Sequence, residues 1–81
     1  MAEHEVRTEL PGVFYRRPTP DAAPFAEPGQ QVTVGQTIGL VEIMKQYSEL
    51  TTPVAGTLTR FVVADTDMVE ADQTVAVVEA G

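Results

Sequence analysis

The chain has 81 residues, no cysteine and a formal net charge of −7. This length fits one small domain, the absence of cysteine excludes disulfides and thiol chemistry, and the acidic balance argues against a surface for nucleic acid or anionic membranes. Residues 1–9 contain no apolar stretch typical of a secretory signal, and no apolar run approaches the roughly 20 residues of a spanning helix. We therefore expect a cytoplasmic protein with no nucleic-acid partner and no membrane partner.

The N-terminal segment is polar, and we expect residues 1–8 to form a flexible tail before a single domain over residues 9–81. The only histidine, His4, lies in this tail, where a histidine is usually just solvated, and we assign it no role. Further along, residues 17–24 contain three prolines, which exclude regular helix and central β-strand. This segment is therefore expected to be irregular.

The chain contains an internal repeat. Residues 29–42 align with residues 66–79 without a gap, at an offset of 37 and with five identities. Residues 11–14 align with residues 55–58 at an offset of 44 and share a glycine. The two offsets differ by seven residues, which places a seven-residue insertion in the first half. The proline-rich segment 17–24 is where this insertion fits.

Both halves of the repeat have the composition of short β-strands. Val, Thr and Ile alternate in part with polar residues, and glycines punctuate the runs. We predict two similar sets of about four strands. Because a few strands present only one apolar face, the sets must pack on each other, which gives an all-β, flattened eight-stranded barrel-sandwich with a quasi two-fold internal repeat. The expected core residues are Val13, Phe25, Val32, Ile38, Leu40, Val54, Leu58, Val62, Val69, Val75 and Val77.

The connection between the two halves, residues 43–52, fits a β-hairpin. A strand would end at Ile43, Met44–Lys45 would form the turn, and a second strand would cover residues 46–51. Tight hairpin turns favour Asn, Asp or Gly, which tolerate positive φ, and Met-Lys gives no such help. Since local rules tend to fail at functional sites, this turn, which holds the only lysine of the chain, is the candidate site.

The same segment also fits an amphipathic helix, because Ile43, Tyr47 and Leu50 recur at positions i, i+4 and i+7. Lys45 would then be an ordinary solvated lysine on the polar face. Residues 51–53, Thr-Thr-Pro, would end such a helix abruptly, and the repeat gives the segment a place as a hairpin. We favour the hairpin on these grounds.

The ordered set of motifs resembles the biotinyl domains of biotin-dependent carboxylases, and especially the carrier domains of bacterial acetyl-CoA carboxylase. Residues 42–46, Glu-Ile-Met-Lys-Gln, resemble the family's Glu-Ala-Met-Lys-Met, in which the lysine carries biotin. Residues 12–16 resemble its Gly-Thr-Phe-Tyr-Arg, residues 18–22 its Pro-Ser-Pro-Asp-Ala and residues 29–35 its Gly-Gln-Lys-Val-Asn-Val-Gly. The resemblance covers nearly the whole chain.

The resemblance implies that biotin is bound covalently to Lys45. A biotin protein ligase would attach it, with Met44 as an apolar recognition contact. Ile43 and Gln46 lie beside the turn, where the family usually has alanine and methionine. The domain would perform no chemistry itself. It would move carboxybiotin between a biotin carboxylase subunit and a carboxyltransferase subunit that serves an acyl-CoA, expected to be acetyl-CoA.

The insertion has a counterpart in the resemblance, the short protruding "thumb" of acetyl-CoA carboxylase carriers, which can contact the biotin ring. Other biotinyl and lipoyl domains generally lack it. The resemblance therefore assigns residues 17–24 to a thumb, where Arg17 stands in place of a frequent threonine. The expected biotin contacts of the thumb are Arg17, Pro18, Thr19 and Pro20.

Two other classes of protein stay open. A lipoyl carrier of a 2-oxoacid dehydrogenase complex has the same fold but usually has Asp-Lys-Ala at the tip. An unmodified barrel-sandwich adaptor, like the lipoyl-like modules of membrane-fusion proteins, usually has a long helical hairpin between its halves. The acidic pairs at residues 65–67 and 70–72 fit a solvated turn and an outward strand face, so we predict no metal and no catalytic residue.

Overall fold

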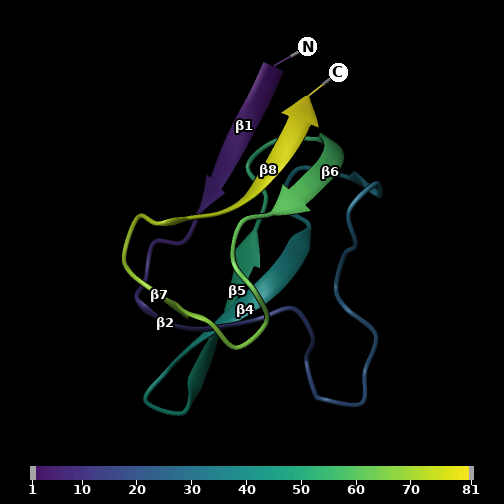
Figure 1. Cartoon of the computed structure of the whole chain (residues 1–81). Coiled ribbons are helices and arrows are strands. Elements are labelled where there is room, and N and C mark those ends of the chain that lie inside the picture. Colours follow the sequence, from purple (N-terminus) through teal and green to yellow (C-terminus); the bar gives the residue numbers. More distant parts are fainter. Residues whose placement is uncertain (1, 81) are drawn as a thin grey trace.

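The structure, a computed structural model, describes residues 2–80, which form eight β-strands and no helix. The strands pair in two antiparallel four-stranded sheets, in the orders β1-β8-β6-β3 and β5-β4-β2-β7 (Figure 1). The all-β prediction is confirmed, and no helix of the described range is long and apolar enough to cross a membrane. The strands are β1 (Ala2–Arg7), β2 (Gly12–Tyr15), β3 (Gln31–Val32), β4 (Thr37–Ile43), β5 (Gln46–Thr51), β6 (Gly56–Phe61), β7 (Met68–Val69) and β8 (Thr74–Ala80).

The internal repeat relates the two sheets to each other. The offset of 44 residues relates β1 to β5 and β2 to β6, and the offset of 37 relates β3 to β7 and β4 to β8. Each sheet contains two strands from each half, in equivalent order. The halves are therefore interlocked, because neither half forms a complete sheet without the other.

The first strand corrects the prediction of a flexible tail over residues 1–8. β1 lies at the edge of its sheet and pairs with β8, with Ala2 opposite Ala80. Its one buried side chain is Val6, and the equivalent strand β5 likewise buries only Leu50. A strand that buries a single side chain is polar in sequence, which is why its composition suggested a tail. Residue 1 lies outside the described range.

Two threonines show that the two-fold relation extends to individual hydrogen bonds. Thr8 Oγ1 donates to the carbonyl oxygen of Leu10 (2.7 Å) and accepts from its amide (3.2 Å). Thr52 makes the same two bonds with Val54, at the same two distances. Both threonines are buried, and a buried hydroxyl must be hydrogen-bonded to avoid a desolvation cost. The pair stabilises the two equivalent bends that follow β1 and β5.

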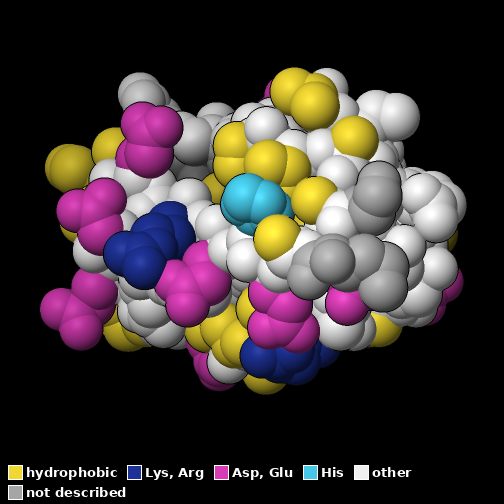
Figure 2. Space-filling view, turned by 90° about the horizontal axis from the view of Figure 1, so that it is seen from above, with side chains coloured by type: hydrophobic (Ala, Val, Ile, Leu, Met, Phe, Trp, Pro, Cys, Tyr) yellow, Lys and Arg dark blue, Asp and Glu magenta, His cyan; other side chains and the backbone are white. Residues whose placement is uncertain are grey.

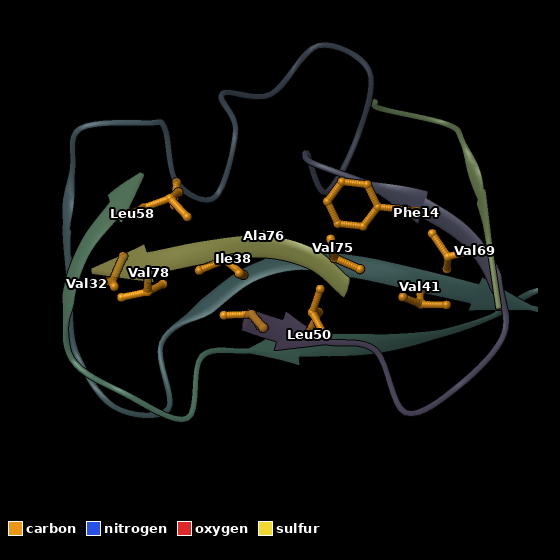
Figure 3. Packing of buried hydrophobic residues seen from close by; sticks show 12 residues of the cluster. Phe14, Val32, Ile38, Val41, Leu50, Leu58, Val69, Val75, Ala76 and Val78 are labelled. Carbon is orange, nitrogen blue, oxygen red and sulfur yellow. The ribbon is translucent and has the colours of Figure 1, made fainter. Parts of the chain in front are cut away.

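The core lies between the two sheets and is mostly aliphatic (Figure 3). Its largest fully buried side chain is Phe14, whose ring centroid lies 5.8 Å from that of Phe61. Because neighbouring strand residues point to opposite faces, this ring occupies the space between the sheets while Val13 faces outward. The buried cluster comprises Val6, Phe14, Ala26, Val32, Ile38, Val41, Leu50, Leu58, Val69, Val75, Ala76 and Val78.

The predicted core is partly correct. Residues buried as expected are Val32, Ile38, Leu58, Val69, Val75 and Val77. Residues that are only half-buried are Val13, Phe25, Leu40 and Val54. The prediction is wrong for Val62, which is 47% exposed just beyond the end of β6. Where adjacent strand residues are both apolar, as in Leu40 and Val41, the sequence does not tell which one faces the core.

Two glycines allow strands to approach closely at equivalent places. A Cβ atom at Gly12 would overlap the backbone carbonyl oxygen of Glu42, and one at Gly56 would overlap that of Glu79. Gly12 therefore lets β2 pass against β4 directly before the hairpin, and Gly56 lets β6 pass against β8 near the chain ends. These are the two glycines that the offset of 44 matches in the sequence.

Candidate functional site

The candidate site is a tight β-hairpin. β4 ends at Ile43, β5 begins at Gln46, and these two residues pair with each other. The two turn residues both have positive φ, 51° for Met44 and 66° for Lys45, which is the conformation of a type I′ turn. The predicted hairpin is confirmed, and the alternative amphipathic helix is wrong.

The turn is fully accessible and lies far from the chain ends. Met44 is 90% exposed and Lys45 is also exposed. Figure 1 shows the β4–β5 hairpin (teal) at one end of the molecule and both termini at the other. In the two-fold relation the turn occupies the place where, in the other half, β8 ends beside the start of β1. The described residues therefore leave Lys45 accessible at the tip, with no strand packed over the turn.

The base of the hairpin is anchored although its tip is exposed. Ile43 is half-buried and packs against the core cluster. Gln46, its partner across the ladder, is exposed. A bulky residue that reaches the core directly before the turn fixes the direction in which Lys45 leaves the fold. A functional side chain is held more exactly on such a rigid element than on a loop.

A tyrosine on the neighbouring strand connects the hairpin to the rest of its sheet. The hydroxyl of Tyr15 donates to Glu42 Oε1 over 3.0 Å, and the ring centroids of Tyr15 and Tyr47 lie 6.2 Å apart. The hydrogen bond to the Glu42 carboxylate, together with burial, raises the pKa of Tyr15 above its usual value. Sequence reasoning missed this group, since Tyr15 and Glu42 are 27 residues apart and share no local pattern.

The inserted segment 17–24 forms an irregular loop between β2 and β3, as predicted. Its base is closed by the amide of Phe25, which donates to the carbonyl oxygen of Arg16 (2.9 Å). Within the loop, Arg17 Nη1 donates to the carbonyl oxygen of Ala22 (3.1 Å). The loop is thus held by its own backbone acceptors, and we call it the thumb.

A groove of about 310 Å³ separates the thumb from the hairpin. Tyr47, two residues beyond Lys45, contributes to it from the hairpin side. The structure therefore brings the predicted thumb residues together with the hairpin, although they are distant in sequence. The lining residues are Tyr15, Arg17, Pro18, Thr19, Pro20, Tyr47, Asp65 and Thr66.

The base of the thumb is fixed from the second half of the chain. The guanidinium carbon of Arg16 lies 4.7 Å from the centroid of the Phe61 ring, a cation–π contact. The backbone amide of Arg16 donates to Asp65 Oδ1 (2.8 Å), and Asp67 Oδ2 accepts from the amide of Ala64 (2.9 Å). These two aspartates therefore act as turn acceptors, and residues 2–80 contain no group of acidic or histidine side chains that could hold a metal.

An all-β barrel-sandwich with an exposed lysine on a rigid hairpin turn is suited to carry a group on that lysine. The model of the family described as "Biotin-requiring enzyme", which covers biotin and lipoyl domains, matches residues 4–78. The chain belongs to this family.

The curated relatives are more specific in their names. The chain is 37% identical over 79 residues to the biotin carboxyl carrier protein of acetyl-CoA carboxylase from Haemophilus influenzae, covering 98% of this chain and 51% of the relative. It is 38% identical over 68 residues to the protein of that name from Pseudomonas aeruginosa, covering 84% and 44%. The chain thus spans about half of these relatives or less.

A solved structure agrees with the fold. The crystal structure of the urea carboxylase of Kluyveromyces lactis superposes with a TM-score of 0.81 and 25% sequence identity. The match covers 98% of this chain and 6% of that much longer protein. The barrel-sandwich prediction is therefore confirmed by this superposition as well as by the strand topology.

Proposed function

We propose that this domain carries biotin as an amide on Lys45 and serves as the non-catalytic carrier of an acetyl-CoA carboxylase. The observation that carries the proposal is the position of the only lysine, at the exposed tip of a type I′ hairpin in a chain of the biotin family. The names of the relatives support the acetyl-CoA carboxylase assignment.

The chemistry at Lys45 requires a second protein. A lysine amine is nucleophilic only in its neutral form, after a proton has been removed from the ammonium group. A biotin protein ligase would remove that proton. The neutral amine then attacks the activated carboxyl carbon of biotinyl-adenylate, forming a C–N bond as the C–O bond to AMP breaks. The amide is uncharged, so the formal charge falls from −7 to −8. Met44, with Ile43 and Gln46 beside the turn, would supply ligase contacts.

The groove beside the hairpin fits a small fused-ring group. Tyr15, Tyr47 and two prolines offer apolar surfaces, while Arg17 and Asp65 offer a donor and an acceptor for a polar ureido edge. The thumb residues Arg17–Pro20 would hold the biotin ring in this groove whenever it is not bound in the active site of a partner enzyme. Bound biotin supplies a ureido nitrogen that accepts and releases a carboxyl group.

The proposed partners beyond the ligase are a biotin carboxylase subunit and a carboxyltransferase subunit. The carrier contributes a tether that raises the effective concentration of the biotin ring at both active sites. A rigid hairpin at the end of the molecule opposite the termini suits this task, because further chain attached at either terminus would not obstruct the tip.

The proposal is tested by the intact mass of the chain after co-expression with a biotin protein ligase. We expect the addition of one biotin to the wild type and none to Lys45→Arg, which keeps the charge and the fold. A lipoyl group added by a lipoyl ligase, with no biotin from the biotin ligase, would instead assign the domain to a 2-oxoacid dehydrogenase complex. No addition from either ligase would favour an unmodified adaptor.

A further inference from the structure

The internal two-fold relation offers a comparison for each outward-facing position of the two sheets. We call the sheet β5-β4-β2-β7, which contains the β4–β5 hairpin, the hairpin sheet. Its successive strand pairs place four residues in one row across the outer face, and these are Tyr47, Glu42, Val13 and Met68. The equivalent row on the other sheet is Glu3, Glu79, Thr57 and Gln31. Only the glutamate is common to both rows. We call the first row the hairpin-side row.

The fold does not require apolar side chains in the hairpin-side row, since polar ones occupy the same backbone positions in the other sheet. Nevertheless Tyr47 is 60% exposed and Met68 is 79% exposed. Apolar surface left in water is unfavourable, and tyrosine and methionine are enriched where proteins bind each other. The difference between two otherwise equivalent faces therefore indicates that a protein covers this one.

The hairpin-side row is also preorganised. Tyr15 contacts both members of the cross-strand pair Glu42 and Tyr47. Its hydroxyl donates to Glu42 (3.0 Å), and its ring centroid lies 6.2 Å from that of Tyr47. Aromatic side chains that are already fixed lose little conformational entropy when a partner binds. The face is thus ready to bind without rearrangement.

The position of the row selects the partner. Tyr47 follows Lys45 by two residues, or roughly 7 Å along a strand at about 3.4 Å per residue. The enzyme that joins biotin to Lys45 must reach the lysine amine itself, so its surface has to contact the residues directly beside the turn. The carboxylase and the carboxyltransferase act on a ring at the far end of the biotin arm and do not need this contact.

The two faces also differ in the balance of their charged side chains. On the other sheet two acidic side chains have basic neighbours, with Glu5 paired to Arg7 (2.6 Å) and Glu3 near Arg60 (3.8 Å). Figure 2, which views the end with the chain termini, shows acidic and basic side chains mixed. Within the described range, the outward strand positions of the hairpin sheet carry Glu42 and Glu49 and no arginine, while Arg17 of the thumb lines the groove beside Tyr47. A partner with basic side chains around an apolar centre complements this face.

We infer that Tyr47, Val13 and Met68 form the docking face for the biotin protein ligase, whose matching surface is apolar at its centre and basic at its rim. This inference rests on the proposed function. The ligase would then recognise a surface of the hairpin sheet as well as the turn. The inference also explains why the outer face of this sheet carries apolar residues where the equivalent positions of the other sheet are polar.

The test copies the polar character of the other face onto this one. The triple variant Tyr47→Gln, Val13→Thr, Met68→Gln removes the apolar row without changing the net charge. The matched control places apolar residues on the opposite face, as Thr57→Val with Gln31→Met. Biotinylation kinetics are measured with a purified biotin protein ligase, and binding of ligase to the unmodified domain is followed separately by NMR chemical-shift changes.

For the triple variant we expect KM of the domain to rise about tenfold with kcat nearly unchanged, together with loss of the shift changes on the hairpin sheet. The control should behave as wild type in both measurements. Kinetics of the triple variant within twofold of wild type would overturn the inference. So would normal ligase kinetics combined with weakened binding to biotin carboxylase, or with loss of a homodimer, since either result would assign the face to another occupant. Absence of biotin on the wild type would overturn the proposed function as well.

Discussion

At the scale of single residues, the site combines a strained turn with an anchored base. Met44 and Lys45 both have a left-handed backbone conformation. Residues other than glycine and asparagine adopt this conformation at a cost of roughly 1 kcal/mol each. Ile43 packs against the core directly before them. The turn is therefore less stable than one built from Asn or Gly, but it places the lysine amine at the tip of the hairpin while the end of β4 stays anchored in the core.

Replacing the lysine by glycine separates stability from function. Lys45→Gly should raise the free energy of unfolding by roughly 1 kcal/mol, because glycine adopts positive φ without strain, and should abolish biotin addition. Urea unfolding and intact mass measure the two effects. As a control, Gln46→Gly, one residue further on and inside β5, should lower stability by a similar amount. A Lys45→Gly variant less stable than wild type would contradict the strained-turn account.

The hydrogen bond between Tyr15 and Glu42 predicts a pH dependence. The bond stabilises the neutral phenol, so the pKa of Tyr15 lies above its usual value of 10.0. Its contribution to stability is present below that usual value and is lost as the pH rises through the pKa of the folded state. The stabilisation is therefore intact at neutral pH.

Absorbance titration can measure this pKa directly, since Tyr47→Phe leaves Tyr15 as the only tyrosine. Adding Glu42→Gln in that background should lower the pKa of Tyr15 toward 10.0, because an amide oxygen favours the neutral phenol less than a carboxylate does. An unchanged midpoint would show that the carboxylate does not control the phenol.

At the scale of elements, the hairpin could be predicted and β1 could not. The position of the hairpin turn follows from the repeat, which places a connection between Glu42 and the second half. β1 also belongs to the repeat, as the buried pair Val6 and Leu50 shows. That match consists of few residues, and the polar composition of residues 1–8 concealed it. The signal that could have found it is the offset of 44, which also aligns Thr8 with Thr52.

Other features depend on contacts between distant segments. The thumb was predicted from its prolines, but its closeness to Tyr47 follows from the way β2 and β5 flank β4 in one sheet. The inward position of Phe14 depends on the register of β2 against β4, where Phe14 lies opposite Val41. Strand register is set by packing of both partners, so one segment read alone does not contain it.

The role of β1 can be tested with one substitution. Val6→Ala should lower the free energy of unfolding by roughly 2 kcal/mol, because it removes buried methyl groups and leaves a cavity. His4→Ala, at an exposed position two residues away in the same strand, should change stability by less than about 0.5 kcal/mol. Equal effects of the two substitutions, measured by urea unfolding, would restore the flexible-tail interpretation.

At the scale of the whole molecule, two-fold symmetry relates most of the fold, and three features depart from it. The paired threonines, the paired glycines and the sheet orders obey the symmetry. The thumb, the lysine turn and the hairpin-side row depart from it. All three departures lie on or beside the hairpin sheet, which is the sheet that the proposed function uses.

The symmetry itself predicts equivalent responses in the two halves. Gly12→Ala and Gly56→Ala should each lower the free energy of unfolding by roughly 2 kcal/mol or more, because each new methyl group meets a backbone carbonyl that cannot move away easily. Gly29→Ala, where a Cβ atom has open space around it but φ is 92°, should cost only about 1 kcal/mol. Unfolding experiments in which Gly12 tolerates alanine and Gly56 does not would contradict this equivalence.

The central claim is that this domain carries a carboxyl group on a biotin at Lys45. It is tested most directly by incubating the biotinylated chain with a biotin carboxylase subunit, ATP and labelled bicarbonate, followed by carboxyltransferase and acetyl-CoA. We predict that the wild type takes up the label and then transfers it to acetyl-CoA, and that Lys45→Arg takes up none. A biotinylated chain that acquires no label from the carboxylase would contradict the account.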